Sequence, residues 1–116
     1  MSLSGGSMKI LSRAEELVLL SVWRLQDDAY GVTIRKHIIE MTGTDWSIGA
    51  IYVPLDRLTK WGYLEAIQGE PTSERGGRSK RYYNLTPEGL DALKRLRQMQ
   101  KNMWSELPDF ALHSKT

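Results

Sequence analysis

The sequence ERGGRSKRYY at residues 74–83 combines positive charge, backbone freedom and aromatic rings in one short stretch. Its four cationic residues are Arg75, Arg78, Lys80 and Arg81. Grouped cations of this kind neutralise nucleic-acid phosphates, and Gly76 and Gly77 would allow the backbone to follow a narrow groove. The first two cations suit the negative potential of a minor groove, and the last two suit backbone phosphates. Because a basic loop is more often plain solvated surface, the surrounding elements must decide between these interpretations.

The composition sets limits on the chemistry. With 116 residues, 41% of them hydrophobic and 26% charged, the chain is expected to form one globular domain. It has no cysteine, which excludes disulfides and thiolate metal sites. The two histidines, His37 and His113, have no partner at metal-ligand spacing, and no nucleophile–base pattern occurs. We therefore predict neither an enzyme, nor a metal site, nor a cofactor.

No apolar run approaches the roughly 20 residues that cross a bilayer, and no signal-peptide pattern opens the chain. These observations predict a cytoplasmic protein that does not bind membranes.

Three helices are expected in the first half. Ser12 and Glu15 have capping-box spacing and predict a helix that ends near residues 26–28. A second helix should follow Tyr30-Gly31, with an inner stripe of Ile34, Ile38 and Met41. Ser47 can cap a third helix with inner residues Ile48, Ile51, Leu55 and Leu58. Pro54 lies inside this helix, which should bend there or begin irregularly.

The second half predicts a hairpin and one more helix. Residues 64–68 and 81–85 are strand-like, and the loop of residues 69–80 separates them. Thr86-Pro87 is a typical helix start, and Pro108 should end that helix near Leu107. Helix, helix, helix, hairpin, helix is the order of the winged helix-turn-helix, a mainly α fold with a β-hairpin. We predict a flexible tail at residues 1–9, the winged-helix domain at 10–86, a C-terminal dimerisation helix at 87–108 and a tail at 109–116.

In this fold the third helix and the hairpin contact DNA. The residue types at these positions favour such a contact. Gly49 and Ala50 permit close approach to a groove wall, and Ser47 can offer its hydroxyl and amide to a phosphate. Tyr52 is predicted to face DNA or, in an alternative of equal weight, to pack against the hairpin. Lys60 is predicted to contact a phosphate.

Other residues near this surface have structural interpretations. Arg57 is expected to pair with Asp56 or another acid rather than to read a base. For Tyr83 we predict packing in the core, and Tyr82 is left open between core and phosphate.

The last helix has more apolar surface than one small core can cover. We predict a dimer seam on it, formed by Leu93, Leu96, Met103, Trp104 and Leu107. The alternative is intramolecular packing, which is expected for the first half of this helix.

Two motifs make the sequence similar to the PadR-like family of winged-helix transcriptional repressors. They lie at GAIYVPLDRLTKWGYL (49–64) and ERGGRSKRYYNLTPEG (74–89). The matching positions are Gly49, Ile51, Tyr52, Leu55, Arg57 and Leu58, and then Tyr82, Tyr83, Leu85, Thr86 and Gly89. Tyr30-Gly31 also matches, and the resemblance covers about residues 10–107. One departure is that the family often has proline directly after the helix tyrosine, whereas here it follows one residue later, at Pro54.

The resemblance implies a homodimer that binds a palindromic double-stranded DNA operator and represses transcription until an effector releases it. It also implies that a small aromatic or hydrophobic effector could bind near Trp104, although an interface anchor is the simpler role for this residue. The alternative function is a winged-helix protein–protein interaction module without DNA binding. Such a module would not need four cations around two glycines, which favours the DNA-binding hypothesis.

Overall fold

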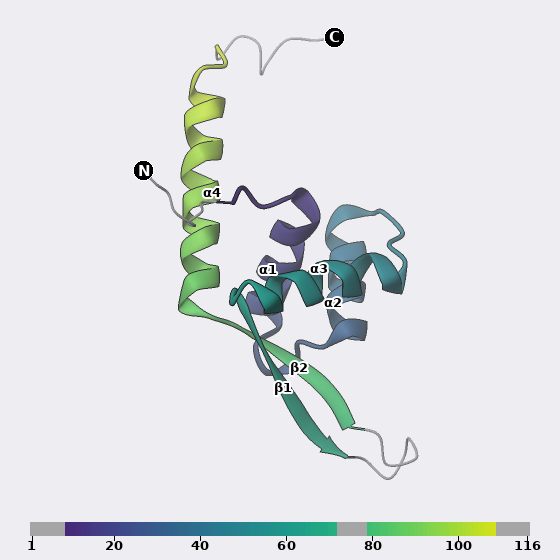
Figure 1. The fold of residues 1–116 in the computed structure, drawn as a ribbon. Coiled ribbons are helices and arrows are strands. Elements are labelled where there is room, and N and C mark those ends of the chain that lie inside the picture. Colours follow the sequence, from purple (N-terminus) through teal and green to yellow (C-terminus); the bar gives the residue numbers. More distant parts are fainter. Residues whose placement is uncertain (1–8, 72–78, 109–116) are drawn as a thin grey trace.

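The computed structural model describes residues 9–71 and 79–108, and shows a three-helix body with a projecting hairpin and a long outer helix (Figure 1). The elements in chain order are α1 (Arg13–Leu25), a 3-10 turn η2 (Gln26–Asp28), α2 (Gly31–Thr42), α3 (Ile48–Lys60), β1 (Leu64–Pro71), β2 (Ser79–Leu85) and α4 (Pro87–Ser105). This order confirms the predicted mainly α winged helix-turn-helix fold.

Three helices begin where the sequence predicts, because each start has a capping side chain. Ser12 Oγ accepts from the Glu15 amide at 3.1 Å, and the Glu15 carboxylate accepts from the Ser12 amide at 2.8 Å. Ser47 and Thr86 cap α3 and α4 in the same manner, each accepting a backbone N–H at 3.0 Å. These bonds satisfy amides that a helix leaves without an internal partner.

The core lies between α1, α2, α3, the hairpin and the first half of α4. Its members are Leu11, Val18, Leu19, Val22, Ala29, Ile34, Ile38, Ile51, Leu55, Leu58, Leu64, Tyr83, Ala92 and Leu96. Two predicted inner residues are not in it: Met41 is 70% exposed and Ile48 is 45% exposed. Both lie in the end turns of their helices, where no neighbouring element covers them.

Pro54 does not interrupt α3, which is one unbroken helix with a regular capped start. Of the two predicted alternatives, a bend or an irregular first turn, the irregular first turn was wrong. Proline removes the donor that would bond the Ala50 carbonyl, but Ala50 is exposed, so water can hydrate that carbonyl. The proline ring itself is buried.

The hairpin is longer than predicted, since its strands extend from Leu64 to Pro71 and from Ser79 to Leu85. They pair antiparallel, with Leu64 opposite Leu85 and an irregularity between Gln68 and Pro71. A single bridge between Tyr30 and Tyr82, together with a 2.9 Å bond from the Tyr83 amide to the Ala29 carbonyl, attaches β2 to the start of α2. The hairpin is therefore fixed to the helix-turn-helix through the middle of β2.

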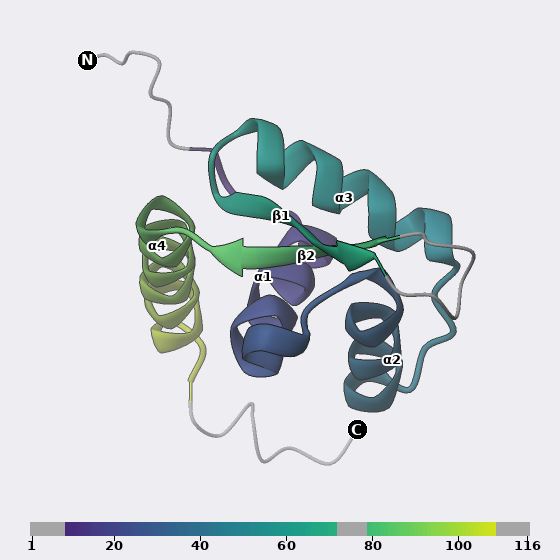
Figure 2. The ribbon, with the colours of Figure 1, turned by 90° about the horizontal axis from the view of Figure 1, so that it is seen from below.

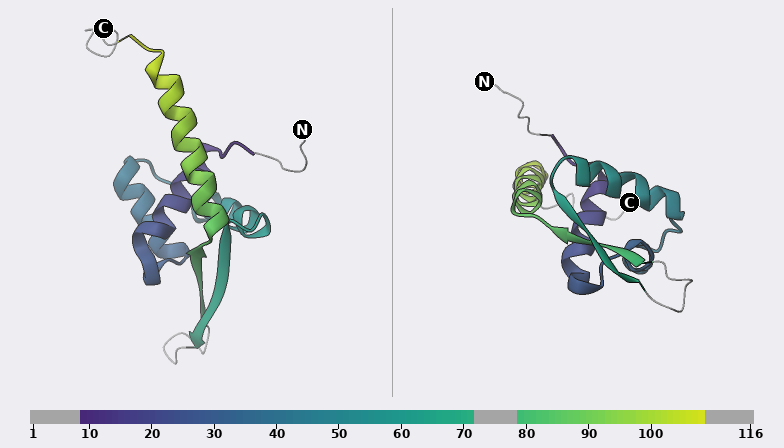
Figure 3. Two further views of the ribbon diagram at one scale, coloured as in Figure 1. Left: turned by 90° about the vertical axis from the view of Figure 1, so that its left-hand side faces the viewer. Right: turned by 60° about the horizontal axis from the view of Figure 1, so that its bottom comes forward.

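Helix α4 runs along the outside of the body and projects beyond it (Figures 1 and 3). Its first half packs on the core through Ala92 and Leu96, whereas residues 101–108 are all exposed. The helix ends at Ser105, two residues before the predicted Leu107, and turn bonds from the Glu106 and Leu107 amides follow.

Candidate nucleic-acid interface

The first turn of α3 presents small, exposed residues to solvent. Ser47, Gly49 and Ala50 are all exposed, and a Cβ added at Gly49 would meet only the Ser47 hydroxyl at 4.0 Å. Because Ser47 Oγ already accepts the Ala50 amide, its own hydroxyl proton stays available to an incoming acceptor. A backbone phosphate or a groove wall can therefore approach this turn closely.

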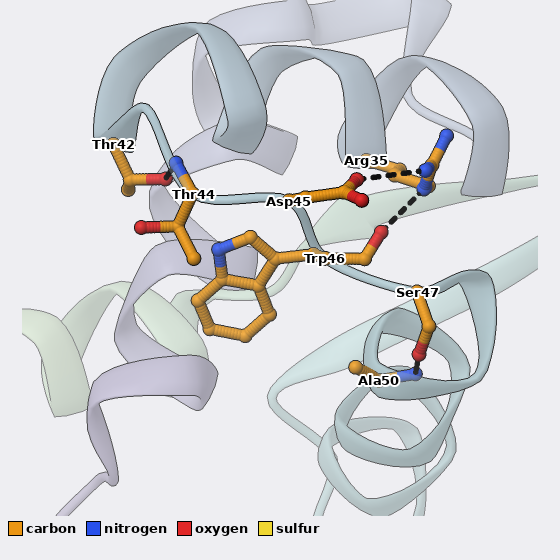
Figure 4. A network of polar contacts seen from close by, with 7 residues as sticks. All are labelled: Arg35, Thr42, Thr44, Asp45, Trp46, Ser47 and Ala50. Atoms are coloured by element: carbon orange, nitrogen blue, oxygen red, sulfur yellow. Dashed lines mark hydrogen bonds and ion pairs between the residues drawn. The ribbon is translucent and has the colours of Figure 1, made fainter.

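Arg35 of α2 bonds the connection that leads to α3 (Figure 4). Its guanidinium donates to the Trp46 carbonyl at 2.6 Å and to Asp45 Oδ1 at 3.3 Å, both in the connection between the helices. The Thr44 amide adds a 3.2 Å bond to Thr42 Oγ1. The sequence analysis did not identify this role of Arg35, because its partners come ten and eleven residues later.

Arg57 pairs with an acidic residue, as the sequence interpretation held, and the partner is Glu15 of α1. Arg57 Nε lies 2.7 Å from Glu15 Oε2; the Glu15 side chain is 6% exposed and that of Arg57 is 42% exposed. Burial raises the pKa of Glu15, but the hydrogen bonds from Ser12 and Arg57 outweigh it and hold the pKa below its ordinary value. Arg57 therefore joins α3 to α1.

Tyr52 is 41% exposed and does not simply point away from the body. Its hydroxyl lies against Gly31, where an added Cβ would be 2.2 Å from the oxygen. The residue thus connects the face of α3 to the first turn of α2.

The hairpin contributes cations on both of its faces. Lys80 is half-buried, and its ammonium lies 4.4 Å from the centre of the Tyr30 ring. Arg81 is exposed, with its guanidinium 5.7 Å from the centre of the Tyr83 ring. The remaining predicted wing residues, Arg75, Gly76, Gly77 and Arg78, lie outside the described residues.

Tyr83 is 1% exposed, so the prediction of core packing is confirmed, while Tyr82 is half-buried against Tyr30. Burial raises the pKa of the Tyr83 hydroxyl, and the nearby Arg81 offsets part of this effect. Among the residues that the structure describes, this hydroxyl has no hydrogen-bond partner.

The first turn of α3 and the outer end of the hairpin lie on the same side of the molecule, away from α4 (Figures 1 and 2). Lys60 is exposed but is the last residue of α3, about 18 Å along the helix from its first turn at 1.5 Å per residue. The structure thus separates Lys60 from the other predicted contacts of this helix.

The predicted dimer residues of α4 and of the turn that follows it divide into two groups. Leu96 is 8% exposed and belongs to the core of its own chain, and Leu93 is half-buried beside it. Met103, Trp104 and Leu107 are 69%, 61% and 40% exposed and together line a shallow apolar surface.

Within residues 9–71 and 79–108, no three acidic or histidine side chains lie close enough to bind a metal ion together. In the same part of the chain, none of the helices has the length and apolar character required to cross a bilayer.

A helix-turn-helix followed by a two-stranded hairpin and one outer helix defines the class of winged-helix proteins. The chain belongs to the transcriptional regulator PadR-like family, whose profile matches residues 19–95. This confirms the resemblance carried by the two sequence motifs, and the family is one of regulators rather than enzymes. The curated proteins include no match to the sequence.

Several solved structures have the same fold as this chain. A PadR family transcription regulator from Clostridium difficile is 22% identical, with a TM-score of 0.68, and the alignment covers 86% of this chain and 99% of that one. A PadR-like transcriptional regulator from Bacillus cereus is 25% identical, with a TM-score of 0.65 and coverages of 87% and 92%. A transcriptional regulator from Thermoplasma acidophilum is 19% identical, with a TM-score of 0.65 and coverages of 89% and 96%.

Proposed function

We propose that this chain is a cytoplasmic, homodimeric regulator that binds a specific DNA operator, represses transcription and is released by an effector. The observation that carries the proposal is the exposed, small-residue first turn of α3 on the same side as the outer end of the hairpin. A module that binds only proteins would not need a basic hairpin beside a helix start whose small residues let a groove wall approach.

In the proposed complex, α3 enters the major groove with its first turn leading. Ser47, Gly49 and Ala50 contact the groove wall and a phosphate, and the exposed edge of Tyr52 lies nearby. The basic segment of residues 75–81 follows the adjacent minor groove and its phosphates. Lys60 would meet a different phosphate, since it lies at the other end of α3.

The dimer is proposed to form through α4. The apolar surface of Met103, Trp104 and Leu107 has no cover within the described chain. A groove between α1 and α4, with Leu20, Trp23, Leu90 and Leu93 among its lining residues, offers a complementary surface on a second copy. Lys94 and Arg97 at this groove and Glu106 beside the apolar surface have opposite charges. A two-fold pair would therefore bury two equivalent contacts.

An effector completes the proposal. A small aromatic or hydrophobic molecule would bind near Trp104, where apolar side chains of the two copies would meet.

Selection of DNA from random duplexes tests the DNA-binding part. We expect a palindrome with half-sites about 34–36 Å apart, or a multiple of that distance. Binding to the selected duplex should weaken steeply with salt, with a log–log slope near −0.9 per neutralised phosphate. Failure to enrich any sequence, or affinity that barely changes with salt, would contradict the proposal.

Light scattering after size exclusion tests the dimer. Wild-type chain should have twice the monomer mass, and Trp104→Ala should shift the population toward monomer. Asn102→Ala, an exposed change on the same helix, is the matched control and should leave the mass unchanged. An unaltered dimer in Trp104→Ala would argue against this interface.

A further inference from the structure

Lys80 is held against an aromatic ring instead of a carboxylate. Its ammonium lies 4.4 Å from the centre of the Tyr30 ring and 3.4 Å from the Tyr30 hydroxyl oxygen. Within the described part of the chain, none of the ion pairs includes Lys80. A cation–π contact does not neutralise the ammonium as a carboxylate would, so the charge remains available to an anion.

Tyr30 has a fixed position. Its backbone bridges Tyr82 of the hairpin, and the two rings meet edge to face with centres 5.3 Å apart. Its amide donates to Thr33 Oγ1 at 3.0 Å. The Tyr82 ring is itself seated over Gly69, where an added Cβ would come within 2.8 Å of it. The platform beneath Lys80 is therefore built from both strands and from the start of α2.

The hydrogen-bond directions leave several donors unused. Lys80 donates one of its three protons to the Tyr30 oxygen, so the Tyr30 hydroxyl proton must point elsewhere. Both residues are only half-buried, which leaves the remaining ammonium protons and this hydroxyl accessible. Two adjacent donors, one of them charged, favour an anion with several acceptor oxygens.

We propose that Tyr30 and Lys80 together hold one phosphate of the DNA backbone where the outer half of β2 meets the start of α2. The inference rests on the proposed DNA-binding function and adds Tyr30, a residue outside both the α3 and the wing predictions. The Tyr30 hydroxyl donates to one phosphate oxygen and the Lys80 ammonium to another. Tyr82 is a positioning residue that fixes the Tyr30 ring.

The contact anchors the protein without reading sequence. A phosphate bound at the junction of β2 and α2 would orient the hairpin and the helix-turn-helix together, because both elements supply its ligands. Its loss should weaken binding to every duplex by a similar factor.

The test is fluorescence anisotropy of the full chain with a labelled random-sequence duplex, over a series of salt concentrations. We expect Lys80→Met to reduce the log–log salt slope by about 0.9 per protomer. Tyr30→Phe keeps the ring but removes the hydroxyl, and should weaken binding about tenfold with little change in slope. With a selected operator duplex, Lys80→Met should reduce the slope and Tyr30→Phe should weaken binding by the same amounts.

Lys101→Met is the matched control, because it removes an exposed lysine from the far half of α4, and its slope should equal that of wild type. Urea unfolding checks that each variant is folded, and Lys80→Gln replaces Lys80→Met if the latter is not. If the wild type binds DNA and the Lys80 variant has the same salt slope as the wild type, the inference is overturned but the proposed function is not. Absence of wild-type binding to either duplex would overturn the proposed function and the inference with it.

Discussion

Replacing Arg57 should destabilise the fold more than replacing Glu15, although the two residues form one ion pair. The Glu15 side chain is 6% exposed and that of Arg57 is 42% exposed. Arg57→Met leaves a carboxylate out of water, and among the described residues Ser12 remains as its hydrogen-bond partner. Glu15→Gln leaves a guanidinium that water can still reach. Arg57→Met should therefore lower the free energy of unfolding more than Glu15→Gln does.

The magnitude follows from this difference in burial. Loss of the partner of a buried charge costs about 3–5 kcal/mol, and we expect Arg57→Met to lie near the lower end because the Ser12 amide and hydroxyl remain. Glu15→Gln keeps an oxygen that can accept the Ser12 amide, so about 1–2 kcal/mol is expected. The double variant should cost less than the sum, because it leaves no buried charge.

Urea unfolding followed by far-UV circular dichroism, at one fixed protein concentration, measures these differences. The exposed pair of Asp91 and Arg95 is the control, and Asp91→Asn should change the free energy of unfolding by less than about 1 kcal/mol. A larger cost for Glu15→Gln than for Arg57→Met would refute the reasoning.

The pH dependence gives a second check on the same pair. The folded pKa of Glu15 lies below its ordinary value, so its ionisation stabilises the fold above an unfolded pKa of about 4.3. This contribution disappears as the pH falls through the folded pKa. In Arg57→Met the deficit relative to wild type should shrink on acidification, because protonation removes the buried charge.

Three further changes test other parts of the structure. Gly89→Ala places a Cβ 2.2 Å from the Tyr63 carbonyl oxygen, a backbone atom that cannot rotate away, and should cost about 1–3 kcal/mol in urea unfolding. Tyr83→Phe removes a hydroxyl without a partner among the described residues, and should leave stability unchanged or raise it by up to about 1 kcal/mol in a thermal melt. Ser47→Ala should cost about 1 kcal/mol through loss of its bond to the Ala50 amide and should also weaken operator binding in anisotropy.

The sequence by itself determined the order of elements and most of the helix starts. Ser12 with Glu15, Ser47 and Thr86 cap amides only three residues away, so the interaction is complete within a short segment and can be read from spacing. The glycine-containing basic segment and the strand-like runs also identified the hairpin. Together with the PadR-like motifs, these local signals were sufficient for the fold and the family.

The tertiary structure decided which side chains meet. Arg57 and Glu15 are 42 residues apart, and neither the Tyr52–Gly31 contact nor the Lys80–Tyr30 contact has a signal in residue spacing. Periodicity likewise shows that a helix face is apolar without showing what covers it. Leu96 lies in the core of its own chain, whereas Met103, one heptad later, is exposed, because α4 extends past the body that would have covered it. Contacts between distant segments depend on how the elements pack, and that packing is a property of the whole chain.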